Sequence, residues 1–511
     1  MRLKSTVKNM KYNFIFLILL TLFNFISRFF FIKTLGVDIV GVNSVISNLL
    51  GFLNIAELGV GLAITYSLYS PLANGDNEKI SEIMYLFKYY YKLIAMIILV
   101  AGIILSLFLK FFIKGQVNLF DVYIYYYLFL LGIVASYFYS YKQVFIIADQ
   151  KQYIVTSRKN TFIIIKLIIQ IISLELFRSY IIWIILEVIF NVSALIYISK
   201  ICDKSFSDID FKKKYDVKKV KQKHHDITSN IKNTFIHKIV AFIVFETDGL
   251  LISLFLNLRY TGVYSNYMLI ITGVTGIIST VMSSVTASVG NLIAVGDEVK
   301  SYGVFRKLYL IDSFIAIIVT YIMYNLINPF VSVWIGSEYL FGKYAVLFLM
   351  LNVYIKIIRG SVERFKEGYG IFWDNFAPIL EGLINFVISI ILVQKIGVVG
   401  LFIGTFISNI VIILMWKPYI VYKKGFHISV WNHVILFSKY TIMAVLTAFI
   451  SNVIVGFIYN SLNMSNTTLI GFIVYSVVIC VSITVISCIV YMSQKEFRSL
   501  MKYIVNIRKN I

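Results

Sequence analysis

The feature that most constrains this chain is a succession of apolar stretches of about twenty residues, separated by short segments that hold most of the charged residues. Residues 94–109, for example, contain no charged side chain. A helix of that length spans a hydrocarbon layer of roughly 30 Å, whereas strands of a membrane β-barrel alternate polar and apolar residues. The mean hydropathy of +0.85 and the charged fraction of 14% also lie outside the range of soluble domains. The sequence predicts an all-α integral membrane protein.

About 14 transmembrane helices are expected from the lengths of the apolar stretches. The first ends in Ser27-Arg28-Phe29 and lacks a small-residue cleavage site, so it is expected to stay as a membrane anchor. We place the spans at residues 12–33, 39–69, 89–109, 121–146, 160–177, 179–199, 233–257, 262–294, 308–327, 342–358, 375–394, 396–416, 440–460 and 467–490.

Lysine and arginine set the expected orientation, because these residues accumulate in cytoplasmic loops. With the N-terminus inside, about 35 of the 47 basic residues fall in inside segments and about seven outside. Both termini and the basic segment 200–232 are therefore expected to be cytoplasmic. This asymmetry and the attraction to anionic membrane lipids account for the net charge of +22, so no nucleic-acid partner is expected.

Motifs for catalysis and for cofactors are missing from the sequence. The closest approach to a phosphate-binding loop, residues 336–344, has one residue too many before the second glycine and ends on Tyr344 instead of Ser or Thr. Cys202, Cys480 and Cys488 lack the spacing of a metal site or a disulfide framework. We expect no enzyme activity, cofactor or metal, and energy from an H⁺ or Na⁺ gradient, the membrane potential or the substrate's own gradient.

An internal repeat appears when the chain is shifted so that Gly41-Val42-x-Ser44 falls on Gly262-Val263-x-Ser265. The same shift places the matching residues of 65–76 on 286–297 without a gap. Two parallel lobes of about six helices each imply alternating access, with the substrate between the lobes. The expected organisation is an N-terminal six-helix lobe at 1–199, a basic cytoplasmic linker at 200–232, a C-terminal six-helix lobe at 233–420, and two further helices with a basic tail at 421–511.

The sequence resembles a known family over roughly residues 12–420. The resemblance is carried by NFISRFFFIKTLG at 24–36, Gly41-Val42-Asn43, AELGVG at 56–61, YSPLA at 69–73, DGLLIS at 248–253, GVYSNY at 262–267, Asn385 and Gly404-Thr405. These segments are similar to the Wzx-type flippases of capsule and O-antigen repeat units, in the multidrug, oligosaccharidyl-lipid and polysaccharide exporter superfamily. The resemblance implies transfer of undecaprenyl-diphosphate-linked oligosaccharide between the leaflets of the bacterial cytoplasmic membrane.

The same resemblance makes polysaccharide polymerase and assembly proteins candidate partners. Two other functions stay open on the residues. A cation-coupled multidrug or metabolite antiporter shares the two-lobed fold, but is expected to have a smaller, acidic or aromatic pocket. A lipid scramblase or an assembly scaffold needs no charge pair in a cavity.

Charged residues inside a membrane are costly, so each is a candidate site residue. Arg28 lies roughly 24 Å along the first helix, with Asn24 on the same face, and its planar guanidinium suits a diphosphate. The alternative is that Arg28 reaches to the outer interface. Asp248 lies at a similar depth on the repeat-related helix, where it is expected to form either a switch or a static ion pair with Arg28. Glu57 either lines the cavity or packs between helices.

Lys356, Arg359 and Arg364, with Glu381 facing them from the next helix, form a basic cluster near the inner surface. This cluster is either a cytoplasmic basic mouth for the diphosphate or a structural group of ion pairs. The lone charges Lys166, Glu187 and Asp312 are expected to find partners within their own lobes.

Overall fold

In a computed structural model, every regular element of the described residues is helical. The structure describes residues 2–53, 55–211, 213–224, 248–371, 374, 376–462 and 469–509. The elements that precede residue 270 are α1 (Arg2–Leu35), α2 (Val37–Leu53), α3 (Ile55–Asn74), α4 (Asn77–Ser106), α5 (Leu109–Phe112), α6 (Leu119–Ala148), α7 (Gln152–Phe177), α8 (Tyr180–Ser205), α9 (Val217–Lys223), α11 (Asp248–Phe255) and the start of α12 (Leu258–Ala294).

The remaining elements complete the chain. They are α13 (Glu298–Trp334), η1 (Ser337–Tyr339), α14 (Lys343–Ile358), α15 (Gly360–Gly368), α16 (Phe376–Ile396), α17 (Val398–Ser408), η2 (Asn409–Trp416), α18 (Lys417–Ile420), η3 (Val421–Gly425), α19 (Trp431–Leu462), α20 (Leu469–Tyr491) and α21 (Lys495–Lys509). The chain divides into two compact units, Met1–Leu269 (unit 1) and Ile270–Ile511 (unit 2).

Within the described part of the chain, 12 helices are long and apolar enough to cross a membrane. Each overlaps a stretch that the sequence predicts as a span. The other two predicted spans have a different outcome. Residues 39–69 form two separate helices, α2 and α3, and of 233–257 only the end is described, with α11 at Asp248–Phe255. In its described residues the chain is an all-helical, multi-pass membrane protein, but the predicted count of fourteen spans is not confirmed.

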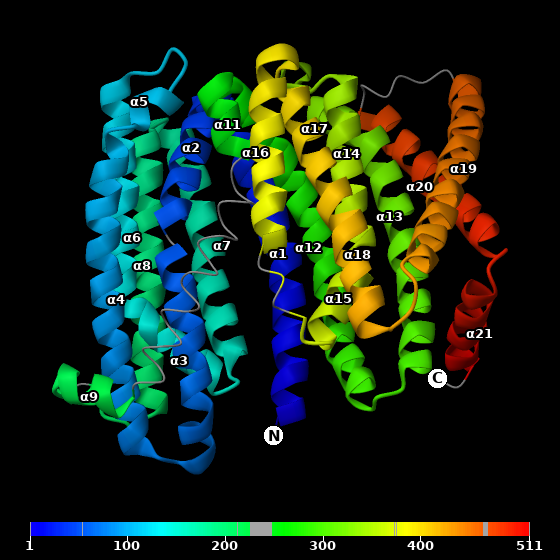
Figure 1. Ribbon diagram of the computed structural model, residues 1–511. Coiled ribbons are helices and arrows are strands. Elements are labelled where there is room, and N and C mark those ends of the chain that lie inside the picture. The colour runs from blue at the N-terminus through cyan, green and yellow to red at the C-terminus, as the bar shows by residue number, and fades with distance from the viewer. Residues whose placement is uncertain are drawn as a thin grey trace. The chain divides into compact units, whose positions relative to one another are not determined.

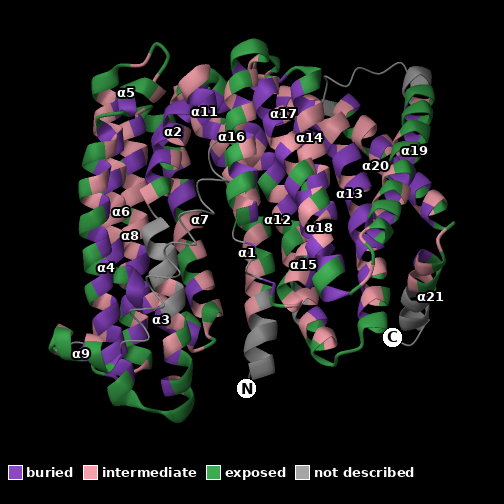
Figure 2. Ribbon diagram, viewed as in Figure 1, coloured by how far each residue is buried: buried purple, intermediate pink, exposed green. Residues whose placement is uncertain are grey.

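The surface of the helices is apolar, as a lipid environment requires. Large side chains such as Leu176, Phe449 and Phe457 are exposed, the last at 76%. On α19 the exposed residues follow the helix along most of its length (Figure 2). An apolar surface of this extent is unfavourable in water and ordinary against lipid tails.

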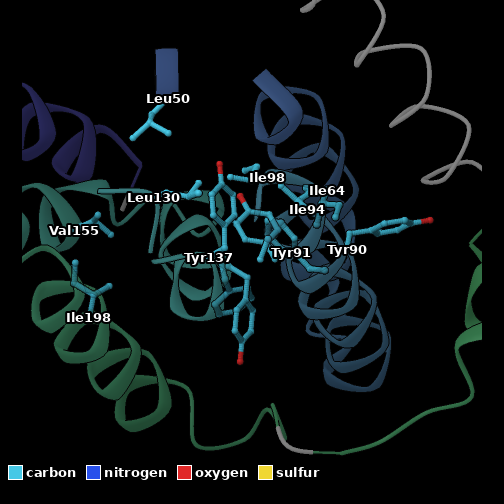
Figure 3. Packing of buried hydrophobic residues seen from close by; sticks show 14 of the residues in the cluster. Leu50, Ile64, Tyr90, Tyr91, Ile94, Ile98, Leu130, Tyr137, Val155 and Ile198 are labelled. Atoms are coloured by element: carbon cyan, nitrogen blue, oxygen red, sulfur yellow. The ribbon is translucent and has the colours of Figure 1, made fainter. Parts of the chain in front are cut away.

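In unit 1, α6 packs between α4 and α8, and α7 packs between α1 and α8 (Figure 1). The core between α4 and α6 is aromatic. Tyr91 and Tyr137 lie side by side with tilted rings whose centroids are 5.7 Å apart (Figure 3). Phe87 meets Tyr91 edge to face, with centroids 4.5 Å apart. Such edge-to-face pairs add to the free energy of burial.

In unit 2, α13 is the central element. It contacts α14, α15, α19, α20 and α21, while α16 and α17 form a closely packed hairpin. Close approach in this hairpin depends on Gly404, because a Cβ there would lie 2.2 Å from Ser389 Oγ. Small residues allow helix backbones in a membrane to approach closely.

The Gly-Asp pairs at the end of the internal repeat, Gly75-Asp76 and Gly296-Asp297, have the same local structure in both copies. Gly75 and Gly296 both have left-handed backbones, with φ of +68° and +81°. Each is followed by an aspartate that caps the next helix: Asp76 accepts from Lys79 N at 3.0 Å, and Asp297 accepts from Lys300 N at 2.9 Å. Glycine tolerates this backbone and aspartate satisfies free N–H groups at a helix start.

Two further repeat-related residues, Gly41 and Gly262, lie where α2 crosses the start of α12. A Cβ on Gly41 would lie 2.1 Å from the Leu258 carbonyl oxygen, and one on Gly262 would lie 2.3 Å from the Val37 carbonyl oxygen. Backbone atoms at these distances cannot move aside as a flexible side chain can. The crossing therefore requires glycine on both helices.

We expect Gly41→Ala and Gly262→Ala each to destabilise the protein by about 3 kcal/mol, at the upper end of the usual cost of overpacking. Thermal unfolding of the purified protein measures this. Gly51→Ala is the matched control on α2, because no atom lies within 4 Å of a Cβ at Gly51. Alanine there is expected to be neutral or stabilising by up to about 1 kcal/mol. Equal unfolding temperatures for the Gly41 and Gly51 variants would contradict the close crossing.

Candidate functional site

Unit 1 contains a polar cavity of about 260 Å³. Its lining comes from α1, α2, α6, α7, α8 and the start of α12, and includes two cations and one carboxylate. The lining residues are Asn24, Ser27, Arg28, Phe31, Asn43, Ser47, Phe129, Lys166, Leu167, Trp183, Glu187 and Leu269. The structure thus places two predicted site residues, Asn24 and Arg28, on one cavity wall.

Arg28 is held in this cavity by neutral groups. Its Nη1 donates to Ser265 Oγ at 3.2 Å and to Asn266 Oδ1 at 3.4 Å. Among the described residues, no carboxylate lies within ion-pair distance of Arg28. A guanidinium carries five N–H donors, so most of those of Arg28 are unused by these two bonds. Arg28 therefore keeps both its positive charge and donors for an anion.

The second cation of the cavity, Lys166, is paired. Its Nζ lies 2.6 Å from Glu187 Oε1, with side chains 7% and 18% exposed. Glu187 also accepts from Gln170 Nε2 at 3.1 Å and from Asn191 Nδ2 at 2.9 Å. The sequence prediction that Lys166 and Glu187 find partners within their lobe is confirmed. Because the charges of Lys166 and Glu187 cancel, the net positive charge of the described cavity lining comes from Arg28.

Two buried N–H groups near Arg28 have no hydrogen-bond acceptor among the described residues. They are the indole Nε1 of Trp183, which lines the cavity, and the Nδ2 of Asn266, whose Oδ1 accepts from Arg28. Buried donors without acceptors are costly, and they are common at sites that a ligand completes. Aromatic packing fixes the indole, since Phe31 meets Trp183 edge to face with centroids 5.3 Å apart.

The predicted pair of Arg28 with Asp248 is not formed in this conformation. Arg28 donates to Ser265 and Asn266 instead, because the start of α12 lies beside it. Asp248 is the first residue of α11. A pairing of Arg28 with Asp248 in another conformation stays a prediction. The side chain of Glu57 lies outside the described residues, so its predicted role is untested.

Unit 2 contains its own cavity, of about 410 Å³. Lys356, Arg359 and Arg364, the predicted basic mouth, all line it together with the carboxylates of Asp312, Glu363 and Glu367 and with hydroxyl side chains of α12. The structure thus brings the three predicted cations together in the lining of one cavity. Because three carboxylates accompany the three cations, the lining is close to neutral rather than basic.

Arg364 is already engaged in a buried network. Its Nη2 donates to Asp312 Oδ2 at 2.6 Å, with the two side chains 9% and 2% exposed, and Ser361 donates to the same carboxylate. Asp312 thus finds its partner within unit 2, as predicted. Glu381, which is expected to face the basic cluster, has Lys417 as an ion-pair partner: its Oε2 lies 3.9 Å from the ammonium, which bonds Glu363 at 2.7 Å.

The sequence predicts partners within the lobe for Lys166 and Glu187 but does not pair them with each other, although a signal for this pairing exists. α7 and α8 are joined by a short turn at Arg178 and Ser179, which makes the helices antiparallel neighbours. Both charges lie within about three helical turns of that connection. Opposite charges at similar distances from a tight turn are expected to face each other.

Among the described residues, no group of three or more His, Cys, Asp or Glu is placed to hold a metal ion.

No known family model matches the sequence, and no curated protein matches it. Solved structures do. The lipid II flippase MurJ, in an inward-closed conformation, matches with a TM-score of 0.67 and 15% identity, over 93% of this chain and 99% of that one. An inward-facing multidrug resistance MATE family transporter of the MOP superfamily matches with a TM-score of 0.59 and 13% identity, over 82% and 94%.

A third match is a MOP superfamily transporter from Pyrococcus furiosus, whose binding pocket is described as reversed in polarity. It has a TM-score of 0.53 and 13% identity, over 82% of this chain and 96% of that one. The chain therefore shares the overall fold of these three transporters. The finer resemblance to repeat-unit flippases stays a prediction.

Proposed function

We propose that this protein is a flippase that moves an undecaprenyl-diphosphate-linked oligosaccharide from the inner to the outer leaflet of the bacterial cytoplasmic membrane. The observation that carries the proposal is Arg28, a guanidinium in a polar cavity with only neutral hydrogen-bond partners among the described residues. A cation within an apolar span without a counterion is costly, and an anionic ligand offsets that cost.

The diphosphate is the part of the proposed substrate that Arg28 recognises. A planar guanidinium binds phosphate oxygens through parallel N–H donors, and such charge-assisted bonds are about twice as strong as neutral ones. The indole of Trp183 also lines this cavity, and its N–H has no acceptor among the described residues. The sequence resemblance to repeat-unit flippases and the structural similarity to a lipid II flippase point to the same class of substrate.

The cavity charge weighs against the second candidate, a cation-coupled multidrug or metabolite antiporter. The fold is compatible with that function, since transporters of the MATE family share it. However, the described lining of the unit 1 cavity carries two cations and one carboxylate. A pocket with excess positive charge repels organic cations and attracts anions.

The test is translocation by the purified protein in liposomes. A fluorescent undecaprenyl-diphosphate-linked oligosaccharide is built into both leaflets, and a membrane-impermeant quencher reports the fraction that reaches the outer surface. In vesicles with the protein, we expect the fluorescence of the labelled lipid to be quenched completely. In protein-free vesicles about half of the fluorescence should remain, because the labelled lipid of the inner leaflet stays out of reach of the quencher. Efflux of an organic cation from the same vesicles, with no lipid translocation, would support the antiporter instead.

A further inference from the structure

In the ion pair of Lys166 and Glu187, the carboxylate has more hydrogen-bond partners than the ammonium has. Glu187 accepts three hydrogen bonds, from Lys166, Gln170 and Asn191. Lys166 carries three N–H donors, and its one hydrogen bond to a described residue is the bond to Glu187. If the ammonium moved away, the carboxylate would keep two amide donors. The carboxylate of Glu187 therefore still has hydrogen-bond donors when Lys166 moves away.

The position of this pair distinguishes it from the other ion pairs of unit 1. Lys166 and Glu187 both line the cavity that holds Arg28. The comparable pair of Lys142 and Asp203, also 2.6 Å apart and also between two helices, lies outside the lining. A buried ion pair contributes little net stability compared with apolar packing. Its place on a polar cavity wall therefore calls for a role toward a ligand.

We propose that Lys166 is a second phosphate-binding cation of the unit 1 cavity, and that its ion pair with Glu187 occupies it until a diphosphate binds. This proposal rests on the flippase function above. A diphosphate bound at Arg28 competes with Glu187 for the ammonium of Lys166. The lysine turns on its flexible four-carbon chain toward the second phosphate, while Gln170 and Asn191 retain Glu187.

This arrangement selects for the number of phosphates. A monophosphate has its whole charge on one phosphorus, beside Arg28, and offers no second group to draw Lys166 away from a carboxylate at 2.6 Å. A diphosphate presents a second anionic group and can do so. Glu187 thus acts as a specificity-determining residue: it lowers the affinity for every anion, but lowers it less for a ligand that can replace it. The chemical class selected is a lipid-linked diphosphate over a lipid-linked monophosphate.

The test measures binding of undecaprenyl diphosphate and of undecaprenyl monophosphate to the full-length protein in detergent. Glu187→Gln keeps the size of the side chain and removes its charge, so Lys166 is freed. We expect Glu187→Gln to bind the diphosphate about tenfold more tightly than the wild type does, the effect of one added charge-assisted bond. A purely structural ion pair predicts unchanged or weaker binding, and that result would overturn the proposal.

A second variant keeps the test informative if Glu187→Gln folds poorly. In Lys166→Met with Glu187→Met, both charges are replaced by apolar side chains of similar volume, a change that buried ion pairs often tolerate. We expect this double variant to bind the two lipids with equal affinity. A preference for the diphosphate that survives in the double variant would refute the role of Lys166. Asp203→Asn, which breaks the pair outside the cavity, is the control and is expected to leave both affinities unchanged.

Soluble anions separate recognition of the headgroup from recognition of the lipid tail. Inorganic pyrophosphate is expected to compete with undecaprenyl diphosphate at least tenfold better than inorganic phosphate does, for the same reason. Equal competition by the two anions would count against the two-cation site. If the wild-type protein binds no undecaprenyl diphosphate at all, the proposed function itself fails. If it binds the lipid but Glu187→Gln changes nothing, only the inference about Lys166 fails.

Discussion

Replacement of Arg28 by alanine is expected to reduce translocation of the lipid-linked oligosaccharide about 100-fold, with the protein still inserted and folded. The loss corresponds to two charge-assisted hydrogen bonds to phosphate. Arg28→Lys is expected to reduce translocation about tenfold, because lysine keeps the charge but lacks the planar fork that binds two oxygens at once. The liposome assay with the membrane-impermeant quencher measures both variants.

Arg178→Lys is the matched control for Arg28→Lys. Arg178 is exposed at the turn between α7 and α8 and does not line the cavity. Its replacement is expected to leave translocation unchanged. The alternative role of Arg28, a side chain that reaches to the outer interface, predicts that lysine substitutes fully. Wild-type translocation by Arg28→Lys would therefore reject recognition of a diphosphate through this residue.

The second large effect is expected at the buried pair of Arg364 with Asp312 in unit 2. Arg364→Met leaves the Asp312 carboxylate, which is 2% exposed, without its cation. We expect a loss of about 3 to 5 kcal/mol in the free energy of unfolding, the usual cost of breaking a buried ion pair from one side. Unfolding of the purified protein by heat or denaturant measures the change.

Removal of both charges tests the cause of that loss. Arg364→Met combined with Asp312→Leu is expected to recover most of the stability, because no unpaired charge stays buried. Glu78→Gln is the exposed control, since Glu78 lies 3.9 Å from Lys213 and both side chains are at least half exposed. It is expected to have little measurable effect. A double variant no more stable than Arg364→Met would show that the charge is not the cause.

The helices were largely predictable because the physics of a span is local. About twenty apolar residues satisfy their own backbone and match the bilayer, whatever the neighbouring helices do. The division of 39–69 into α2 and α3 was not predicted, because two apolar helices in succession have the same composition as one long helix. The end of the repeat motif was predictable for a local reason as well, because each of the sequences Gly75-Asp76 and Gly296-Asp297 forms a turn followed by a helix cap.

The candidate site was predictable only in part. Arg28 stood out because an arginine inside an apolar span is rare and expensive. Its hydrogen-bond partners, Ser265 and Asn266, depend on how α1 packs against the start of α12, which no short stretch of sequence encodes. For the same reason, the similar depth of Arg28 and Asp248 along their helices predicts a pair but does not determine which helix faces meet. Pairs across long separations, such as Asp312 with Arg364, require the same knowledge of packing.

The most direct test of the account is a structure of the protein with undecaprenyl diphosphate bound, determined in lipid nanodiscs. We predict that the two phosphates lie in the unit 1 cavity, with oxygens within about 3 Å of the Arg28 guanidinium. The Trp183 indole N–H is expected to donate to the same headgroup. A diphosphate bound instead in the unit 2 cavity, beside Lys356 and Arg359 and away from Arg28, would contradict the central claim that Arg28 recognises the substrate.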